Sequence, residues 1–399
     1  MIFPEDFVNK KILIVGYGKT GKSVKKYLNK YNLYYSIWDD KKNIKVKYLD
    51  RYYYKKNFDY IILSPGINIY QHKKKAFFIK NKKKIITDLD IFFSTKNKYK
   101  YVIGVTGTNG KSSFCNLLHN ILKKNKISSK VIGNFGNAVL DENISSNQYC
   151  IIELSSYQLD YTKYMSLDIA CIINLSPDHL ERHKTFSNYE KAKLKIFSFL
   201  KKPDGNGFYH KKSFPKLNKK KYLKSFSNIN ANLIHQIFNK KILIPKGIFE
   251  QSVLPHRNEF FLSKKNFKFI NDSKSTNFDS TRYAIKKNQN IFLILGGLLK
   301  KGDNYYMKDL MSRIEGVNIY GDRVDALKKS IIAQKIKFNY FNNLKSLLKN
   351  LYLKEYLKNS KVKKKFTILF SPGAASFDQF KNFEDRGIKF KKYVNELFK

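Results

Sequence analysis

Cysteine is scarce in this sequence, and so is negative charge. Three cysteines, Cys115, Cys150 and Cys171, stand at scattered positions among 399 residues, which argues against a disulfide framework or a zinc site and suits a reducing cytosol. No stretch of about 18 apolar residues occurs, so we expect no membrane span. The first residues, MIFPEDFVNKK, lack the apolar segment of a signal peptide. We therefore expect a cytoplasmic protein.

Acidic residues number 31 against 78 lysines and arginines, which gives a formal net charge of +47. Such an excess is typical of nucleic-acid-binding proteins, but here the lysines form short runs along the whole chain, at 73–75, 82–84, 219–221 and 363–365. The chain is also crowded with Asn, Ile, Tyr and Phe, whose codons, like those of Lys, are A/T-rich. A biased genome explains the charge, so we expect no nucleic-acid partner. The charge still attracts anionic substrates over long range.

The length and the hydrophobic content of 42% are sufficient for two or three packed domains. Strand-like apolar stretches that end in polar turns alternate with helical patterns in three segments. This alternation predicts an α/β fold with mostly parallel sheets, in which ligands bind at the carboxyl ends of the strands. The stretch 201–230 is rich in Lys, Asn, Ser and Gly with weak periodicity, and we expect irregular surface structure there.

A glycine pattern, Gly16-x-Gly18-x-x-Gly21, follows the apolar stretch ILIV, and Asp39 stands at about the distance expected for a ribose contact. Backbone N–H groups at such a turn can hold a diphosphate. The pattern does not distinguish a nicotinamide cofactor from a nucleotide sugar, nor either from a ligand-free turn. The stretch LSPGI, which begins at Leu63, ends a later strand of the same segment and is placed to close over that ligand.

The stretch GVTGTNGKSS, which begins at Gly104, is a more specific signal. Its spacing differs from the common phosphate-binding pattern G-x-x-x-x-G-K-[ST], because Val105 stands where the first glycine belongs. Gly107 and Gly110 allow successive N–H groups to point inward, and Lys111 supplies a charge for the β- and γ-phosphates. A serine that follows can bind Mg²⁺ through its hydroxyl. The stretch predicts a site for a nucleotide with Mg²⁺.

Two further strand-like stretches end in groups that can bind a metal ion. Glu153 follows apolar residues in IIELSSYQLD, and His179 follows Asp178 in NLSPDHLERH. A carboxylate at a strand end can hold Mg²⁺ together with the loop serine. His179 is a metal ligand or a structural residue, and His183 pairs with it if a helix begins there. No cluster of cysteines lies nearby, which argues against zinc.

Three other stretches are ambiguous by themselves. NDSKSTN, from Asn271, and SPGAASFDQFKNFEDRG, from Ser371, are dense in small polar groups, which suit either a charged substrate or turns and helix caps. Lys191, Lys193 and Lys195 lie on a predicted helix. Composition alone predicts a solvated face for these lysines.

The order of these motifs resembles that of the Mur ligase family. The stretches GVTGTNGKSS, ELSSYQLD, NLSPDHLERH, LPHRNEF, NDSKSTNFDST and SPGAASFDQFKNFEDRG carry the resemblance over nearly the whole chain, and ELSSYQL with the last stretch is similar to the D-glutamate-adding members. The resemblance implies a Rossmann-like UDP-substrate domain (1–94), a P-loop ATP-binding domain (95–253) and a Rossmann-like amino-acid-binding domain (254–399).

The family's activity is an ATP-dependent amide ligation in peptidoglycan precursor synthesis. The resemblance implies that ATP phosphorylates the L-alanine carboxylate of UDP-N-acetylmuramoyl-L-alanine and that D-glutamate attacks the acyl phosphate. It implies ATP and Mg²⁺ in two sites as cofactors and a monomeric protein. The glycine pattern of the first domain is then a UDP-substrate site and not a nicotinamide site.

The resemblance also assigns site residues by position. The UDP-substrate residues are Gly18, Lys19, Thr20, Gly21, Asp39, Ser64, Pro65, Gly66 and Asn134. The ATP-binding residues are Gly107, Thr108, Asn109, Gly110, Lys111, Ser112, Ser113, Asn232, Arg257 and Asp272. The D-glutamate residues are Lys274, Thr276, Lys300, Ser376 and Phe383. The metal ligands are Ser112, Glu153, His179 and a carbamylated Lys193, and the catalytic residues are Lys111, Lys193 and His179.

The sequence departs from the family pattern in places. Ile229 stands where the family has asparagine, and Leu298 and Leu299 stand where relatives often carry Asp or Gly, which makes Lys301 an alternative to Lys300. Three other functions stay open: a related ligase for a different amino acid, a basic P-loop ATPase that binds nucleic acid, and a nicotinamide oxidoreductase.

Overall fold

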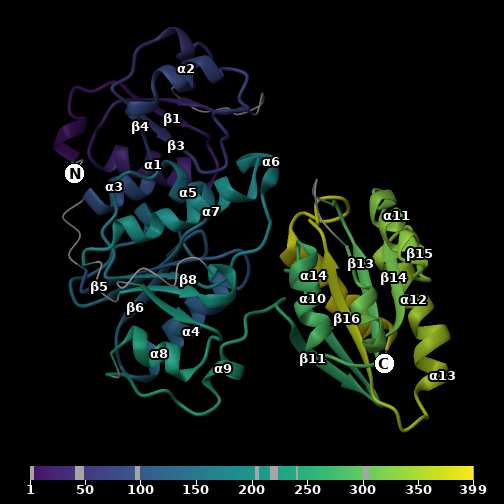
Figure 1. Ribbon diagram of the computed structural model, residues 1–399. Coiled ribbons are helices and arrows are strands. Elements are labelled where there is room, and N and C mark those ends of the chain that lie inside the picture. Colours follow the sequence, from purple (N-terminus) through teal and green to yellow (C-terminus); the bar gives the residue numbers. More distant parts are fainter. Residues whose placement is uncertain are drawn as a thin grey trace. The chain divides into compact units, whose positions relative to one another are not determined.

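The structure is a computed structural model that describes residues 4–40, 49–94, 99–202, 206–215, 223–239, 241–299 and 305–398. The chain divides into two compact units, Met1–Ser252 and Val253–Lys399 (Figure 1). The first unit contains two sheets and the second contains one. Helices alternate with the strands in all three parts, so the predicted α/β class with mostly parallel sheets is confirmed.

The N-terminal sheet has the strand order β2-β1-β3-β4, and all its pairings are parallel. Its elements are β1 (Ile12–Val15), α1 (Lys19–Lys30), β2 (Tyr35–Trp38), β3 (Tyr60–Leu63), α2 (Lys75–Lys80), β4 (Ile85–Ile86) and α3 (Asp88–Ser94). Every residue of β1 is buried, as expected of a parallel strand covered on both faces. Because β1 pairs with β3, the turns that follow these two strands meet at the carboxyl edge.

The central sheet has the order β10-β9-β8-β5-β7-β6 and is also wholly parallel. Its strands are β5 (Tyr101–Thr106), β6 (Ser129–Gly133), β7 (Tyr149–Glu153), β8 (Ile169–Ile172), β9 (Gly207–His210) and β10 (Leu223–Phe226). Its helices are α4 (Lys111–Lys124), α5 (Ser156–Tyr161), α6 (Leu180–His183), α7 (Phe186–Leu194), α8 (Ala231–Ile237) and α9 (Ile248–Gln251). Because β5 lies between β7 and β8, the segments that follow these three strands meet at one edge.

The sheet of the second unit has the order β11-β12-β16-β13-β14-β15. Its strands are β11 (Glu259–Lys264), β12 (Phe267–Asn271), β13 (Ile291–Gly296), β14 (Ile314–Tyr320), β15 (Asn339–Phe341) and β16 (Phe366–Gly373), and its helices are α10 (Phe278–Lys286), α11 (Asp325–Ala333), α12 (Leu344–Leu351), α13 (Leu357–Asn359) and α14 (Phe383–Leu397). Only β11 runs antiparallel to its neighbour in these pairings. The loops after β12, β13 and β16 therefore share one edge.

The expectation of irregular structure at 201–230 is wrong for residues 207–210 and 223–226. This stretch contributes β9 and β10 to the central sheet, and Phe208 and Tyr209 of β9 are 0% and 2% exposed. Each strand has only four residues, which is too short to display a clear alternation. The surrounding Lys and Asn residues therefore dominate the composition of the stretch and obscure its two short strands.

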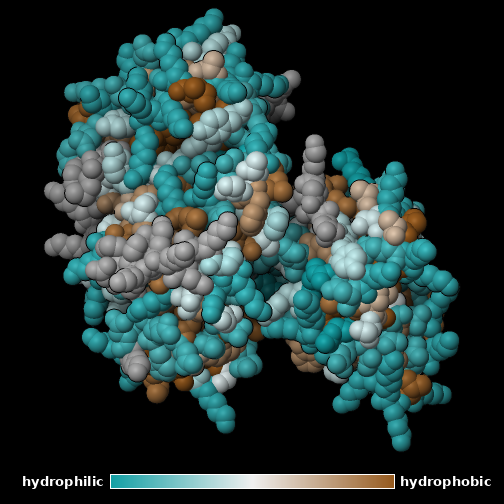
Figure 2. Space-filling model, viewed as in Figure 1, coloured by the Kyte–Doolittle hydropathy of each residue, from teal (hydrophilic) through white to brown (hydrophobic). Residues whose placement is uncertain are grey.

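The surface is strongly hydrophilic, as Figure 2 shows for the face in view. Residues 73–75 and 363–365 are exposed and belong to different units, so these two lysine runs do not form one basic stripe on a single element. Within the described ranges, no helix is both long enough and apolar enough to cross a membrane.

The glycine turn after β1 generates a test of packing. A Cβ atom on Gly21 would lie 2.0 Å from the carbonyl oxygen of Gly16, whereas a Cβ atom on Gly18 would meet nothing within 4 Å. We expect Gly21→Ala to lower the free energy of unfolding by about 2–3 kcal/mol, because backbone must move to relieve the overlap. Gly18→Ala is the matched control and is expected to cost less than about 1 kcal/mol. Chemical denaturation measures both, and equal losses would contradict the tight approach of α1 to the turn.

Candidate active site

The turn after β1 is built around close contacts with its neighbours. Gly16 has a φ of +89°, and a Cβ there would lie 2.8 Å from Cβ of Ser64. The Ser64 hydroxyl donates to the Gly16 carbonyl (2.9 Å), and Oδ2 of Asp39 accepts the N–H of Tyr17 (2.6 Å). The structure thus brings Asp39 and Ser64 to the glycine turn. The other side of Gly18 is open, which leaves room for a ligand beside the start of α1.

Some of the remaining predicted UDP-substrate residues lie near this turn, and others are hydrogen-bonded to loops of the central sheet. Thr20 is in the first turn of α1 and Gly66 in the turn after β3. The Lys19 ammonium donates to the Gly136 carbonyl, and the Pro65 carbonyl accepts a bond from Arg182 (2.7 Å). These last two contacts join the N-terminal sheet to loops of the central one.

The loop after β5 depends on glycine at two positions. Gly107 has a φ of +158°, and a Cβ there would lie 2.5 Å from Cγ1 of Ile173. Gly110 has a φ of +78° and stands immediately before α4. No side chain caps the start of α4, so its first turn, at Lys111, Ser112 and Ser113, presents the N–H groups that suit an anion.

Asn174, which the sequence did not single out, holds this loop in place. Its Oδ1 accepts the N–H groups of Thr108 (3.0 Å) and Asn109 (2.9 Å), and its Nδ2 donates to the Asn109 carbonyl (2.8 Å). Because Asn174 follows β8, these bonds tie the loop to the neighbouring strand end. The N–H groups of Thr108 and Asn109 serve this internal contact, whereas those in the first turn of α4 are placed to meet an anion.

Two lysines converge on one carbonyl of the loop. The Gly107 carbonyl accepts from Nζ of Lys193 (2.8 Å) and from Nζ of Lys111 (2.9 Å). Lys193 is 1% exposed and its Nζ lies 4.8 Å from the ring centre of Tyr189. Burial, and then the charge of Lys111, hold the pKa of Lys193 well below its usual value, although the carboxylates of Asp178 and Glu153 act in the opposite direction. The amine therefore loses its proton more readily than an ordinary lysine.

The solvated-face alternative is wrong for Lys193 and holds for Lys191, which is exposed. Lys195 is half-buried and donates to the carbonyls of Asp160 (3.1 Å) and Thr162 (2.7 Å). The three lysines thus have three different environments on one short stretch. Lys195 stabilises the end of α5, so it is not a neutral comparison for Lys193.

Glu153 is a buried carboxylate with one oxygen available for a cation. It is 2% exposed, and its Oε1 accepts a bond from Nδ2 of Asn134 (2.7 Å). Its Oε2 is buried and makes no hydrogen bond to the residues that the structure describes. A buried anionic oxygen without a donor is costly unless a cation binds it, so Glu153 fits a Mg²⁺ ligand. Asn134, assigned to the UDP substrate, here positions Glu153.

His179 lies beside an aromatic ring and two carboxylates. Its Nδ1 is 2.8 Å from the hydroxyl of Tyr157 and 3.3 Å from Oε1 of Glu181, and its Nε2 is 3.7 Å from Oδ2 of Asp178. The sequence predicts a pairing with His183 only if a helix begins at His179. Helix α6 begins only at Leu180, and Nε2 of His183 lies 3.0 Å from the hydroxyl of Ser156. Burial, followed by neighbouring positive charges, lowers the pKa of His183 to about 4.

A metal ion at this edge would share its coordination with a bound phosphate. In the described part of the chain, no group of three His, Cys, Asp or Glu side chains is arranged for a metal. Mg²⁺ commonly uses one or two carboxylates together with substrate phosphates and waters. Glu153 with the hydroxyl of Ser112, itself 6% exposed, fits that pattern of partial ligation.

In the second unit, the predicted D-glutamate residues Lys274, Thr276 and Ser376 lie on loops at one sheet edge, and Phe383 begins α14. Nζ of Lys274 lies 3.9 Å from the ring centre of Phe383, Ser376 is 2% exposed and Thr276 is half-buried. Lys300 and its alternative Lys301 lie outside the described residues. The contact between Lys274 and Phe383 joins the loop after β12 to the start of α14.

Arg386 connects these loops and is a further residue that the sequence did not reveal. It is 0% exposed, and its guanidinium donates to the hydroxyl and carbonyl of Ser273 (3.0 and 2.7 Å) and to the carbonyl of Ala374 (3.0 Å). Leu298 and Ala375 also exchange two backbone bonds. The loops after β12, β13 and β16 are thereby fixed to one another, with Ser376 next to the junction.

The ATP-side residues outside the loop are divided between the two units. Asn232 is exposed in the first turn of α8, and Arg257 and Asp272 belong to the second unit. Asp272 accepts from the hydroxyl of Ser371 (2.7 Å) and from the N–H of Asn258 (2.8 Å). Burial raises its pKa to about 6, against the effect of these hydrogen bonds and of the Arg257 charge.

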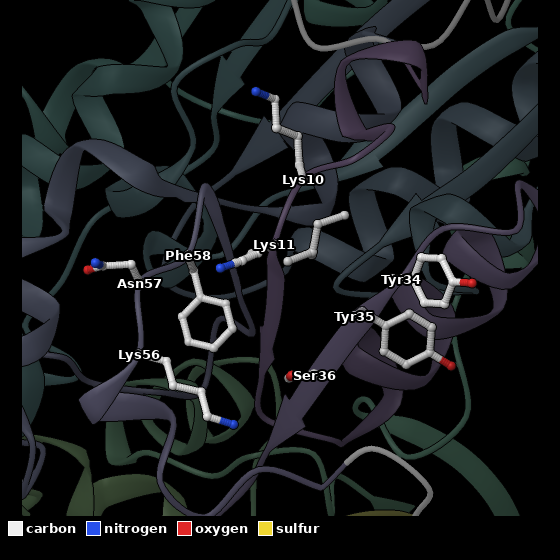
Figure 3. Close-up of a pocket in the computed structure, with 9 residues that line it drawn as sticks. Lys10, Lys11, Tyr34, Tyr35, Ser36, Lys56, Asn57 and Phe58 are labelled. Atoms are coloured by element: carbon white, nitrogen blue, oxygen red, sulfur yellow. The ribbon is translucent and has the colours of Figure 1, made fainter.

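A separate hollow of about 450 Å³ opens at the amino ends of β1 and β2. Tyr34 and Tyr35 lie on one side of it, and Lys56, Asn57 and Phe58 on the other (Figure 3). The motifs follow the carboxyl ends of the strands. This hollow is therefore not the site that the sequence predicts.

Comparison with known proteins identifies the family of this chain. The family model of the Mur ligase middle domain matches residues 105–244, which include the loop after β5, Glu153, His179 and Lys193. UDP-N-acetylmuramoylalanine–D-glutamate ligase from Francisella philomiragia is 30% identical, covering 98% of this chain and 99% of that protein. The enzyme of the same name from Francisella tularensis subsp. novicida is 32% identical, covering 97% and 96%.

Two solved structures share the fold. MurF ligase from Thermotoga maritima, in complex with ADP, aligns with a TM-score of 0.55 at 16% identity, over 96% of this chain and 95% of that one. UDP-N-acetylmuramate-alanine ligase MurC from the same organism aligns with a TM-score of 0.53 at 13% identity, over 97% and 99%. The chain belongs to the Mur ligases, which are ATP-dependent ligases of peptidoglycan synthesis. Within them it belongs to the family of UDP-N-acetylmuramoylalanine–D-glutamate ligases.

The burial of Lys193 generates a second test. We expect Lys193→Ala and Lys193→Arg to lower ATP-dependent phosphate release by about 100-fold or more, because Ala removes the group at the loop and Arg is too large for the same buried position. Lys191→Ala, which removes an exposed lysine of the same helix, should stay within about twofold of the unchanged protein. Thermal unfolding of each variant separates lost chemistry from lost folding. A fully active, folded Lys193→Arg variant would show that the buried amine has no part in the reaction.

Proposed function

We propose that this protein joins D-glutamate to the L-alanine carboxylate of UDP-N-acetylmuramoyl-L-alanine at the expense of ATP. The observation that carries the proposal is the meeting, at the ends of β5, β7 and β8, of a phosphate-binding loop, two lysines and Glu153 with its available oxygen. The names of the relatives that match nearly the whole chain support the identity of the substrates. We further propose a cytoplasmic monomer that binds no nucleic acid.

The reaction begins with transfer of the γ-phosphoryl group of ATP to the alanine carboxylate, which releases ADP and forms an acyl phosphate. The N–H groups at the start of α4 and the ammonium of Lys111 hold the β- and γ-phosphates and reduce repulsion between two anions. On binding phosphate, Nζ of Lys111 exchanges its bonds to the Gly107 and Thr108 carbonyls for phosphate oxygens. Mg²⁺ in two sites would be held by Ser112, Glu153, His179 and the carbamylated Lys193, and it would supply further positive charge.

The second step is attack of the neutral D-glutamate amine on the acyl carbon. A C–N bond forms, the tetrahedral intermediate collapses with cleavage of the C–O bond to phosphate, and the amine loses a proton. Lys274, Thr276 and Ser376, with Lys300, bind the carboxylates of D-glutamate, and Phe383 packs against Lys274. The acyl phosphate must be kept from water until the amine arrives.

Lys193 has a specific part in this proposal as a carbamate. Its amine is buried and its pKa is lowered, so the neutral form that reacts with CO₂ is accessible. Addition of the nitrogen lone pair to CO₂ and loss of one proton give a carbamate. This converts a cation into an anionic oxygen ligand, which suits Mg²⁺ beside Lys111.

A panel of amino acids tests the identity of the second substrate. With UDP-N-acetylmuramoyl-L-alanine and ATP, we expect phosphate release with D-glutamate to exceed that with L-glutamate, L-lysine or diaminopimelate by about 100-fold or more, because the amine and both carboxylates must be placed together. A coupled phosphate assay measures this. Comparable rates with another amino acid would assign the protein to a different ligase of the same family.

The proposed function places ATP at the central sheet and the UDP substrate at the N-terminal sheet, and this separation gives another test. We expect Lys111→Ala to lower turnover by about 100-fold or more, whereas its affinity for UDP-N-acetylmuramoyl-L-alanine should change by less than about threefold, because the uridine diphosphate is held at the turns after β1 and β3. Isothermal titration calorimetry measures the affinity. A large loss of UDP-substrate binding in this variant would contradict the assignment of the two anion sites.

A further inference from the structure

The segment that carries His179 has an unfavourable local backbone. His179 and Lys184 have φ values of 57° and 69°, and they flank the four-residue helix α6. Residues with a side chain seldom adopt positive φ, and such conformations persist only where surrounding contacts hold them. The position of His179 therefore depends on what anchors the segment 178–185.

Two of these anchors come from the N-terminal sheet. Nη1 of Arg182 donates to the Pro65 carbonyl (2.7 Å), and Nε2 of Gln71 donates to the Glu181 carbonyl (2.8 Å). Pro65 lies in the turn after β3, next to Ser64, which bonds to the glycine turn after β1. The segment with His179 is thus tied to the proposed UDP-substrate turn.

Arg182 also reaches His179 through an aromatic ring. The guanidinium carbon lies 4.0 Å from the ring centre of Tyr157, and the Tyr157 hydroxyl lies 2.8 Å from Nδ1 of His179. A guanidinium stacked on an aromatic face is held in one orientation. Three successive contacts therefore link Pro65 to His179 through Arg182 and Tyr157.

The anchoring of Arg182 has little redundancy. The side chain is 9% exposed, yet Nε and Nη2 make no hydrogen bond to the described residues. The bond to Pro65 is thus its one hydrogen bond among them, and stacking supplies the rest. A buried donor without a partner is unfavourable, so arginine at this position calls for a function that a smaller apolar residue would not serve.

We propose that Arg182 is a positioning residue that couples the UDP-substrate turn to His179. The inference rests on the proposed function, which assigns the turn after β3 to the UDP substrate and His179 to the metal site. A substrate held against the turn after β3 fixes the Pro65 carbonyl, which holds Arg182 on Tyr157 and keeps the His179 imidazole in its place. Occupation of one end of the site thereby orders a residue at the other end.

The test compares Arg182→Gln, Arg182→Lys, Tyr157→Phe and the Arg182→Gln/Tyr157→Phe double variant, with Lys191→Ala as the control for a lost surface charge. We expect Arg182→Gln to lower kcat about tenfold or more, with the KM for ATP changed less than about twofold. Arg182→Lys should recover part of the loss, because an ammonium can bond to the Pro65 carbonyl but does not stack flat. In the Tyr157→Phe background, Arg182→Gln should cost little more, as expected of residues acting in one chain.

Hydrogen exchange supplies a readout that does not depend on activity. In the free protein, amides of 178–185 should exchange faster in Arg182→Gln than in the unchanged chain. UDP-N-acetylmuramoyl-L-alanine should slow their exchange in the unchanged protein and not in Arg182→Gln. If calorimetry shows no binding of this substrate to the unchanged protein, the proposed function fails, whereas faster exchange in free Arg182→Gln still supports the anchoring.

Three results would overturn the coupling. Additive losses in the double variant would mean that Arg182 does not act through Tyr157. If the substrate slowed amide exchange of 178–185 equally in Arg182→Gln and in the unchanged protein, the contact would not couple the UDP-substrate turn to this segment. A raised KM for the UDP substrate with an unchanged kcat would make Arg182 a binding residue, whose parallel Nε and Nη2 donors take an oxyanion of the substrate.

Discussion

The side-chain nitrogens of two lysines share the carbonyl oxygen of Gly107, and the geometry of the site follows from this contact. One is on Lys111, at the start of the helix after β5, and the other is on Lys193, on a helix more than eighty residues later. Two like charges at one buried point repel each other unless anions approach or one group loses its proton. In the proposed function, phosphate binds at Lys111 and Lys193 is held in its neutral form.

Hydrogen bonds from the surrounding loops hold the residues of this site in place. Asn174 fixes the loop to the end of β8, and Asn134 turns the Glu153 carboxylate so that one oxygen stays available. On the other side, Arg182 ties the His179 segment to the turn after β3. Each of these bonds joins the ends of two different strands. The carboxyl edge of the first unit thus behaves as one connected set of polar contacts, with a nucleotide loop at its centre.

Much of this arrangement was predictable from the sequence, because its signals are local. The alternation of apolar stretches and polar turns predicted the α/β class, and the glycine spacing from 104 to 110 predicted the nucleotide loop. The strands β9 and β10 were missed because four-residue strands in a Lys- and Asn-rich stretch leave no clear period. Burial of Lys193 could not be deduced from composition either, since Lys191 and Lys195 flank it on the same helical stretch.

The residues that sequence reasoning missed act over long separations. Asn174, Arg182 and Arg386 each bond to backbone more than ten residues away, and no spacing pattern marks such contacts. Polar groups after a strand signal that a site is near, as Asn174 does after β8, but not which partner each will find. Chain topology decides that, because it determines which strand ends are neighbours.

Formation of the carbamate requires that the Lys193 amine be deprotonated, because only the neutral amine reacts with CO₂. The most direct measurement is ¹³C NMR of the protein equilibrated with ¹³C-bicarbonate and Mg²⁺. We expect a carbamate resonance that is present in the unchanged protein and in Lys191→Ala and is lost in Lys193→Ala. A resonance that survives in Lys193→Ala, or no carbamate in the unchanged protein, would contradict it.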